Sequence, residues 1–119
     1  IMDLSGLGLP DRFQGYSLRP LLDENGAWAR DDVFIQYFED PPFPDLPTMT
    51  CLRTASEKLI HYLRDGEGDE FYDLVVDPEE RQNVVDDPAY SGRVTQMRNR
   101  LEAAKRQSDF SLPDLSRQY

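Results

Sequence analysis

The segment between Thr50 and Pro88 constrains the fold most, because it places short apolar stretches between strong turn signals. Three of these stretches are rich in the β-branched, aromatic and other apolar residues of half-buried strands. They are Thr50–Thr54, Lys58–Leu63 and Glu70–Leu74. The first link is short enough for a hairpin, and the second contains two glycines that can adopt positive φ. We therefore predict three consecutive strands, with neighbours in sequence paired in the sheet.

A fourth strand is predicted upstream, at Asp32–Phe38. This stretch is β-branched and aromatic, with little alternation between polar and apolar residues. Such a run indicates either burial on both faces or a face that a missing partner covers. Between this strand and the next, Glu39–Thr48 contains four prolines, which exclude a central strand or a helix interior. We expect an extended loop there.

The segment Pro88–Gln107 is predicted to form one long helix. Asp87 is placed to cap it, and Pro88 suits the first helical position. Apolar residues recur at spacings of four and three, which forms a single stripe on a helix. The stripe consists of Tyr90, Val94, Met97, Leu101 and Ala104. The predicted fold class is α+β: a four-stranded antiparallel sheet with a long C-terminal helix packed on one face.

Shorter helical signals occur elsewhere. Asp77–Glu80 is predicted to start a helical turn, with Asp77 as the cap and Glu80 in the position of a capping-box acid. Met2–Gly6 has the pattern of a last helical turn that ends at a glycine.

A series of short motifs runs through nearly the whole chain in a fixed order. They are Met2–Leu7, Gln14–Leu22, Arg53–Ala55, Lys58–Ile60, Tyr62, Phe71–Leu74, Asp77–Pro78 with Glu80, and Asn83. In this order, the motifs resemble the C-terminal subdomain of the type I sulfatases, which belong to the alkaline-phosphatase-like superfamily. The resemblance implies a fragment in three parts. Residues 1–31 would connect to an N-terminal catalytic domain missing from this sequence, residues 32–107 would form the subdomain, and residues 108–119 would be a tail.

The resemblance also implies an activity for the parent protein, the hydrolysis of sulfate esters. Such enzymes use a formylglycine, made from the first residue of a Cys/Ser-x-Pro-x-Arg motif, beside a divalent metal that is usually calcium. Cys51 is the only cysteine, and no proline follows it two residues later. We therefore predict no catalytic residue, metal ligand or cofactor in this chain, which alone would be inactive. Cys51 is expected to be a small buried hydrophobe.

Two other candidate sites have simpler interpretations. His61 is the only histidine, and we expect an ordinary strand residue because nothing nearby in sequence supplies a partner. Asp65, Glu67 and Asp69 alternate in a glycine-containing link, which suggests calcium. An EF-hand loop is longer and lies between helices, so we favour a solvated hairpin tip.

Arg53 and Lys58 are the candidate substrate-binding residues. They flank a turn in an acidic chain, and the resemblance places this subdomain beside the active-site cleft. Arginine binds oxyanions through paired hydrogen bonds, as a sulfated ligand requires. The alternative is an ion pair with one of the many acids of the same domain.

The net charge of −10, with 23 acidic and 13 basic residues, argues against nucleic acid and anionic membrane surfaces as partners. No apolar run is long enough for a membrane span. We expect Asp32–Phe38 and Met2–Leu7 to leave apolar surface exposed, and therefore a homo-oligomer of the isolated chain. Two alternatives to the sulfatase hypothesis stay open: a phosphonate or phosphate ester hydrolase of the same superfamily, and a stand-alone acidic interaction module.

Overall fold

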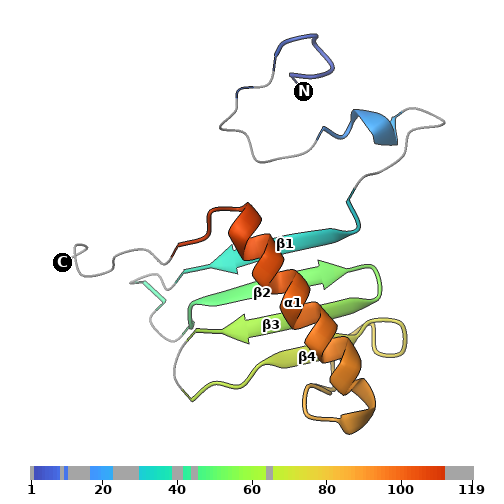
Figure 1. The fold of residues 1–119 in the computed structure, drawn as a ribbon, viewed down its shortest axis with the longest axis vertical. Coiled ribbons are helices and arrows are strands. Elements are labelled where there is room, and N and C mark those ends of the chain that lie inside the picture. The colour runs from blue at the N-terminus through green and yellow to red at the C-terminus, as the bar shows by residue number, and fades with distance from the viewer. Residues whose placement is uncertain are drawn as a thin grey trace. The chain divides into compact units, whose positions relative to one another are not determined.

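A computed structural model describes residues 2–8, 10, 17–22, 30–38, 42–43, 46–63 and 66–111 (Figure 1). The chain divides into two compact units, residues 1–31 and residues 32–119. The second unit contains a sheet and a long helix. Within the described part of the chain, no helix combines the length and the apolar character needed to cross a membrane.

The sheet has four antiparallel strands in the order β1-β2-β3-β4, so every strand pairs with its neighbour in sequence. The strands are β1 (Asp32–Tyr37), β2 (Met49–Thr54), β3 (Glu57–Tyr62) and β4 (Glu70–Asp73). The β2–β3 hairpin is tight because the Thr54 hydroxyl accepts backbone hydrogen bonds from Ser56 at 3.2 Å and Glu57 at 2.9 Å. The predicted strands and their antiparallel arrangement are confirmed.

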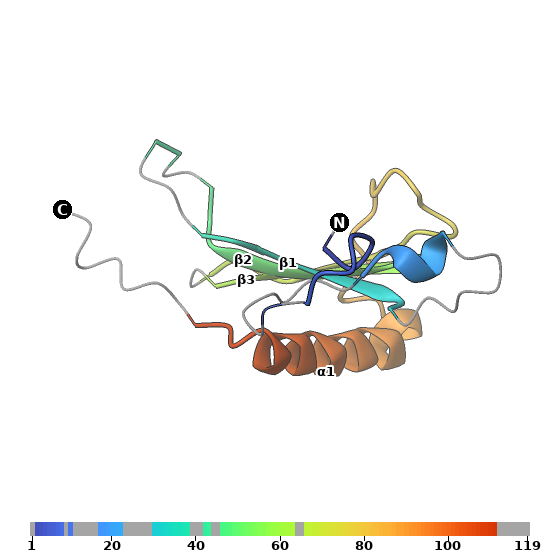
Figure 2. The same cartoon turned by 90° about the horizontal axis from the view of Figure 1, so that it is seen from above.

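The core lies between the sheet and α1 (Ser91–Gln107), which runs across one face of the sheet (Figures 1 and 2). Its fully buried members come from three strands and the helix. They are Leu52, Leu59, Phe71, Val94, Met97 and Leu101, with Tyr90 and Ala104 packed against them. The predicted apolar stripe is therefore confirmed. The N-terminal cap is confirmed as well, since Asp87 accepts a hydrogen bond from the backbone of Ala89 at 2.9 Å, although the first turn, η2 (Pro88–Tyr90), is a 3-10 helix.

The second face of the sheet, opposite α1, is buried at its centre and exposed at β1. A smaller cluster of Cys51, Ile60, Tyr72 and Leu74 covers the centre. Val33 and Ile35, on the same face of β1, remain 48% and 47% exposed. The lack of alternation in this strand thus reflects apolar side chains on both faces, of which only one is covered within the described residues.

The end of α1 turns sharply back toward the sheet. Asp109 has φ 49°, a left-handed conformation that glycine adopts most readily and that asparagine and aspartate tolerate better than other residues. The backbone of Phe110 donates to the carbonyl of Lys105 at 3.0 Å. This turn places the Phe110 ring edge-on to Phe34 and stacked on Phe38, with centroid distances of 6.2 and 6.0 Å. The start of the predicted tail is therefore packed.

The first unit contains a helix-ending turn and a short 3-10 helix. Leu7 donates to the carbonyl of Met2, and Gly6 donates to that of Asp3 with φ 72°, which is the hydrogen-bond pattern of a Schellman motif. This confirms the glycine-ended turn. The second element is η1 (Arg19–Leu21), where the Ser17 hydroxyl accepts from the backbone of Arg19 at 3.2 Å.

The predicted helical turn at Asp77–Glu80 is wrong. The segment forms a single turn in which the backbone of Glu80 donates to the carbonyl of Asp77 at 3.1 Å, and Glu80 has φ 56°. The reason is that the Glu80 side chain bonds to β2 and β3 and does not return to the Asp77 amide. That amide donates to the carbonyl of Asp73 at 2.8 Å, and the Asp77 carboxylate accepts from the backbone of Gln82.

Candidate functional site

Arg53, Lys58 and Glu80 form the cluster most suited to binding an anion. Arg53 and Lys58 face each other across the β2–β3 hairpin, on the second face of the sheet. Arg53 Nη1 donates to Glu80 Oε1 at 2.8 Å, and Lys58 Nζ donates to Glu80 Oε2 at 2.5 Å. Each cation therefore binds a different oxygen of one carboxylate. The hydrogen bond from Lys58 is the main cause of a lowered Glu80 pKa; the bond from Arg53 adds to it, while partial burial opposes it.

The cluster remains partly open to solvent. The Arg53 side chain is 45% exposed and the Lys58 side chain 21%. The ion pair considered for these two cations is thus formed with Glu80, whereas substrate binding by Arg53 and Lys58 stays a prediction. Sequence reasoning missed Glu80 because a glutamate after Asp-Pro also fits a helix start. The remaining signal was chemical: two cations opposite each other in a sheet need a carboxylate nearby.

A tyrosine pair lies on the same face. Tyr72 on β4 is the register partner of Lys58, and Tyr62 lies four positions after Lys58 on β3. Glu70 accepts hydrogen bonds from the hydroxyls of Tyr62 at 2.9 Å and Tyr72 at 2.7 Å. Burial, followed by the hydrogen bond to Glu70, raises the pKa of Tyr62 to about 12 and also raises that of Tyr72. Both hydroxyls therefore stay protonated donors at neutral pH, and they hold the Glu70 carboxylate in place.

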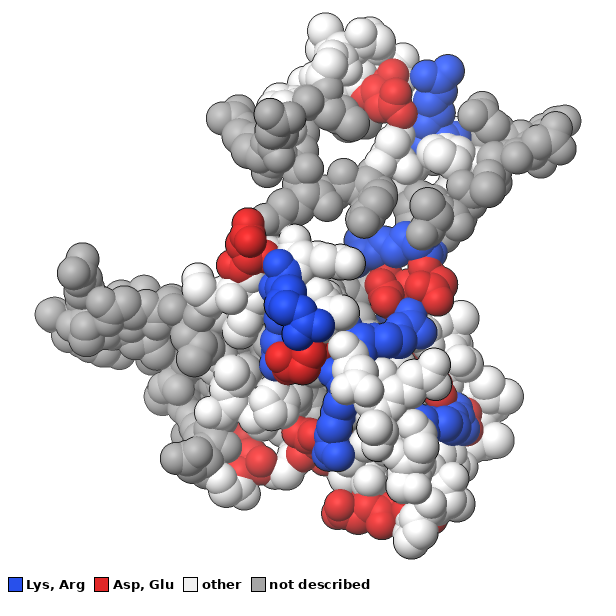
Figure 3. All heavy atoms as spheres, in the orientation of Figure 1, with Lys and Arg blue, Asp and Glu red and all other residues white. Residues whose placement is uncertain are grey.

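On the face that carries α1, positive and negative side chains are interspersed (Figure 3). The reason is that cations of the helix pair with acids of the sheet and its links. Arg93 bonds to Glu57 and Asp73, Arg98 to Asp69, and Arg100 to Asp32. These pairs neutralise one another locally, so the described residues form no continuous basic surface on this face.

His61 lies in β3, as expected of an ordinary strand residue, but the premise that no partner is near was wrong. Its Nδ1 lies 2.8 Å from Asp69 Oδ1, because the β3–β4 connection brings Asp69 back beside β3. Asp69 also accepts from Arg98 Nε at 2.9 Å, and its side chain is only 16% exposed. Burial acts to raise the pKa of Asp69, but the bonds from His61 and Arg98 outweigh it, so the pKa is lowered. Asp69 is therefore not part of a solvated tip, and Asp65 lies outside the described residues.

Cys51 is buried in β2 with 6% exposure, as predicted for a small hydrophobe, and burial raises the pKa of its thiol. The described residues contain no group of three or more His, Cys, Asp or Glu side chains that could hold a metal ion. The described residues therefore offer no such group for the calcium that the resemblance implies for the parent, and Cys51 lacks the proline that the formylglycine motif requires two residues later.

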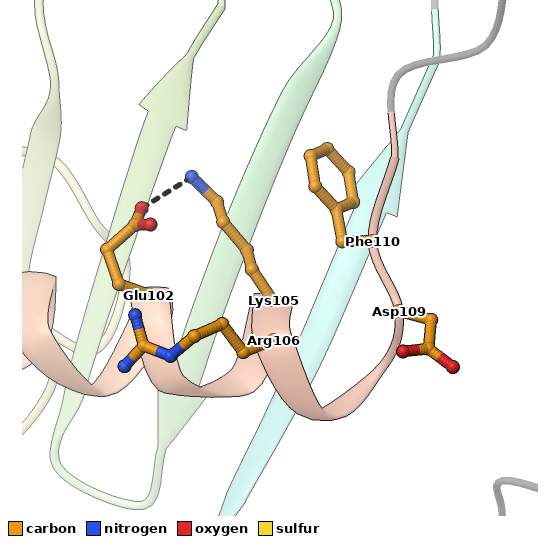
Figure 4. Close-up of a pocket in the computed structure, with 5 residues that line it drawn as sticks. All are labelled: Glu102, Lys105, Arg106, Asp109 and Phe110. Carbon is orange, nitrogen blue, oxygen red and sulfur yellow. Dashed lines mark hydrogen bonds and ion pairs between the residues drawn. The ribbon is translucent and has the colours of Figure 1, made fainter.

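One open hollow lies at the C-terminal end of α1 (Figure 4), with a volume of about 600 Å³. It is lined by Glu102, Lys105, Arg106, Asp109 and Phe110. Lys105 Nζ donates to Glu102 at 2.8 Å and lies 5.8 Å from the centroid of the Phe110 ring. With two cations and two carboxylates, the lining has no net charge to select a ligand.

The comparisons with known proteins agree with the fold. Residues 1–107 match the family model described as N-sulphoglucosamine sulphohydrolase, C-terminal. The chain belongs to this family. It is therefore a sulfatase C-terminal domain of the alkaline-phosphatase-like superfamily, as the motifs indicated.

The curated relatives are sulfatases. An N-acetylglucosamine-6-O-sulfatase of Bacteroides thetaiotaomicron is 29% identical over 116 residues, which cover 95% of this chain and 21% of the relative. A Delta 4,5-hexuronate-2-O-sulfatase of the same organism is 32% identical over 103 residues, or 86% of this chain and 21% of the relative. The chain thus spans about a fifth of the length of these relatives.

Solved structures are similar over nearly the whole chain. A protein in complex with its substrate D-glucosamine-2-N,6-O-disulfate has a TM-score of 0.82 at 30% identity, over 91% of this chain and 22% of that protein. A 2-O GAG sulfatase has a TM-score of 0.77 at 30% identity, over 99% of this chain and 24% of that protein. The phosphonate monoester hydrolase of Agrobacterium radiobacter has a TM-score of 0.73 at 27% identity, over 90% of this chain and 23% of that protein.

Proposed function

We propose that this chain is the C-terminal subdomain of a sulfuric ester hydrolase, in which it completes the fold and lines the substrate cleft. In this proposal the chain carries no catalytic centre of its own. The observation that supports it most is the family match over residues 1–107, combined with sulfatase relatives of which the chain spans about a fifth. The nucleophile and the metal would then belong to the other four-fifths of the protein.

The second face of the sheet is the surface proposed to contact the catalytic domain. The helix-bearing face is already covered by α1, whereas Val33 and Ile35 are about half exposed on β1. Val75 and Val76 are 73% and 72% exposed on the β4–η2 loop, residues 74–87, part of which rises on the side opposite α1 (Figure 2). Exposed β-branched side chains in a chain that is 30% charged are typical of an interaction surface.

Arg53 and Lys58 are proposed to contribute to the cleft by binding an anionic group of the substrate. Both lie on the same face as Val33 and Ile35 and are held by β2 and β3, two adjacent strands in the middle of the sheet. A rigid pair of donors positions an oxyanion better than a loop would. These two residues would hold and orient the ligand, while the groups that perform the hydrolysis would belong to the catalytic domain.

The experiment compares the isolated chain with the longer polypeptide that would contain it, on 6-sulfated N-acetylglucosamine and on an aryl sulfate. We expect turnover by the longer protein only. In the longer protein, Val33→Asp with Ile35→Asp should lower the yield of folded enzyme or its activity at least tenfold, because two carboxylates would be buried at the interface. Gln96→Asp, on the exposed side of α1, is the matched control. Turnover by the isolated chain, or full activity of the double variant, would contradict the proposal.

The likeness to the phosphonate monoester hydrolase keeps a second activity in view. A phosphonate monoester should therefore be assayed beside the sulfate esters, and faster turnover of the phosphonate would favour that alternative.

For the isolated chain, the exposed β1 side chains predict self-association. Sedimentation showing a clean monomer at high protein concentration would contradict this prediction.

A further inference from the structure

We propose that Arg53, Lys58 and Glu80 form an exchange site, in which the Glu80 carboxylate occupies the place that a sulfate or carboxylate group of a ligand takes. This inference rests on the proposed role of Arg53 and Lys58 in the substrate cleft. It assigns a further role to Glu80, which would compete with the ligand from within the chain and leave the cations when the ligand binds.

The geometry of the cluster supports exchange. Arg53 Nη1 and Lys58 Nζ each donate to a different oxygen of the Glu80 carboxylate. The spacing of the two donors therefore already suits two oxygens that are bonded to the same atom. A sulfate ester or a carboxylate presents two oxygens in a similar way. Because β2 and β3 fix the two cations in register, an incoming group can use both donors without movement of the strands.

The backbone at Glu80 indicates that its side chain can be displaced. Its φ of 56° is rare for a residue other than glycine, asparagine or aspartate, and such strained residues concentrate at ligand sites. The residue belongs to the irregular β4–η2 loop, where its own amide donates to the nearby Asp77 carbonyl. Release of the carboxylate would relax the backbone, which offsets part of the loss of the two ion pairs.

The charge of the two cations and their exposure to solvent are also suitable for exchange of Glu80 against an anionic ligand. Removal of Glu80 leaves two neighbouring cations without their carboxylate, and one incoming anion restores the original balance. The Arg53 guanidinium is already partly exposed, at 45% of its side chain, so a ligand can contact it before Glu80 leaves. Lys58, at 21%, becomes accessible as the carboxylate moves away.

The test is titration of the chain with inorganic sulfate at constant ionic strength, followed by calorimetry and by chemical shifts of Arg53 and Lys58. We expect weak binding by the wild type and at least tenfold tighter binding by both Glu80→Gln and Glu80→Gly. Glycine adopts a φ of 56° without strain, so the second variant keeps the loop conformation. Glu79→Gln, which removes an exposed neighbouring carboxylate, is the control and should bind as the wild type does.

Adding Arg53→Ala to Glu80→Gln should abolish the gain. The inference is overturned if neither Glu80 variant binds sulfate more tightly, if the gain survives Arg53→Ala, or if both variants unfold. In that last case Glu80 is a structural tie and cannot be a displaceable group. Acetate in place of sulfate identifies which oxyanion the site prefers. Because this binding needs no catalytic domain, its outcome is independent of the hydrolysis assay.

Discussion

Replacement of Met97 by alanine tests how much stability comes from the contact between α1 and the sheet. Met97 is fully buried, at 0% exposure, in the cluster with Leu52, Leu59 and Phe71. The substitution removes Cγ, Sδ and Cε, and at roughly 0.8 kcal/mol for each buried group the transfer loss is about 2.4 kcal/mol. The cavity that remains adds to this, so we expect the free energy of unfolding to fall by about 2–5 kcal/mol.

The assay is urea unfolding monitored by circular dichroism, with wild type and variant at the same protein concentration. Gln96→Ala, at an exposed position of the same helix, is the control and should change stability by less than about 0.5 kcal/mol. A loss below about 1 kcal/mol for Met97→Ala would show that the helix stripe is not the core.

Three further predictions concern an ion pair, a thiol and a helix end. The hydrogen bond from Arg93 lowers the pKa of Asp73 below its ordinary value of 3.8, so the pair stabilises the fold above that pH and stops doing so as the pH falls through the lower folded pKa. On acidification, the urea midpoint should therefore fall less in Arg93→Ala than in the wild type. Equal losses in the two proteins would count against the pair. Because burial raises the pKa of the Cys51 thiol, a thiol reagent at neutral pH should modify it at least tenfold faster in urea than in the native chain, and equal rates would contradict its burial. Asp109→Gly should raise the free energy of unfolding by about 1 kcal/mol, since glycine accepts the left-handed turn there, whereas no gain in thermal unfolding would show that Asp109 is unstrained.

The regular part of the fold could be predicted from sequence because its signals are local. The β2–β3 link allows one hairpin, and the spacing of Val94, Met97 and Leu101 fixes the buried side of the helix. The same residues then determine which face of the sheet is covered. The resemblance to sulfatases added the family, which the comparisons confirmed.

The candidate site was only half predictable, because its contacts join residues distant in sequence. Arg53 and Lys58 were identified as an unusual pair of cations, but Glu80 looks like a helix-start residue and adopts a left-handed backbone instead. His61 and Asp69 are likewise eight positions apart, and only the β3–β4 connection brings them together. Local propensity describes such residues poorly, because the ion pairs they form in the folded state decide their conformation.

We propose above that this chain is the C-terminal part of a sulfuric ester hydrolase. The most direct measurement is the sequence of the coding region upstream of Ile1. We expect an open reading frame that encodes Cys or Ser followed by x-Pro-x-Arg, with acidic metal ligands before that motif. A start codon a few residues before Ile1, with no such motif, would contradict the claim and leave a binding role for a stand-alone domain of the same fold.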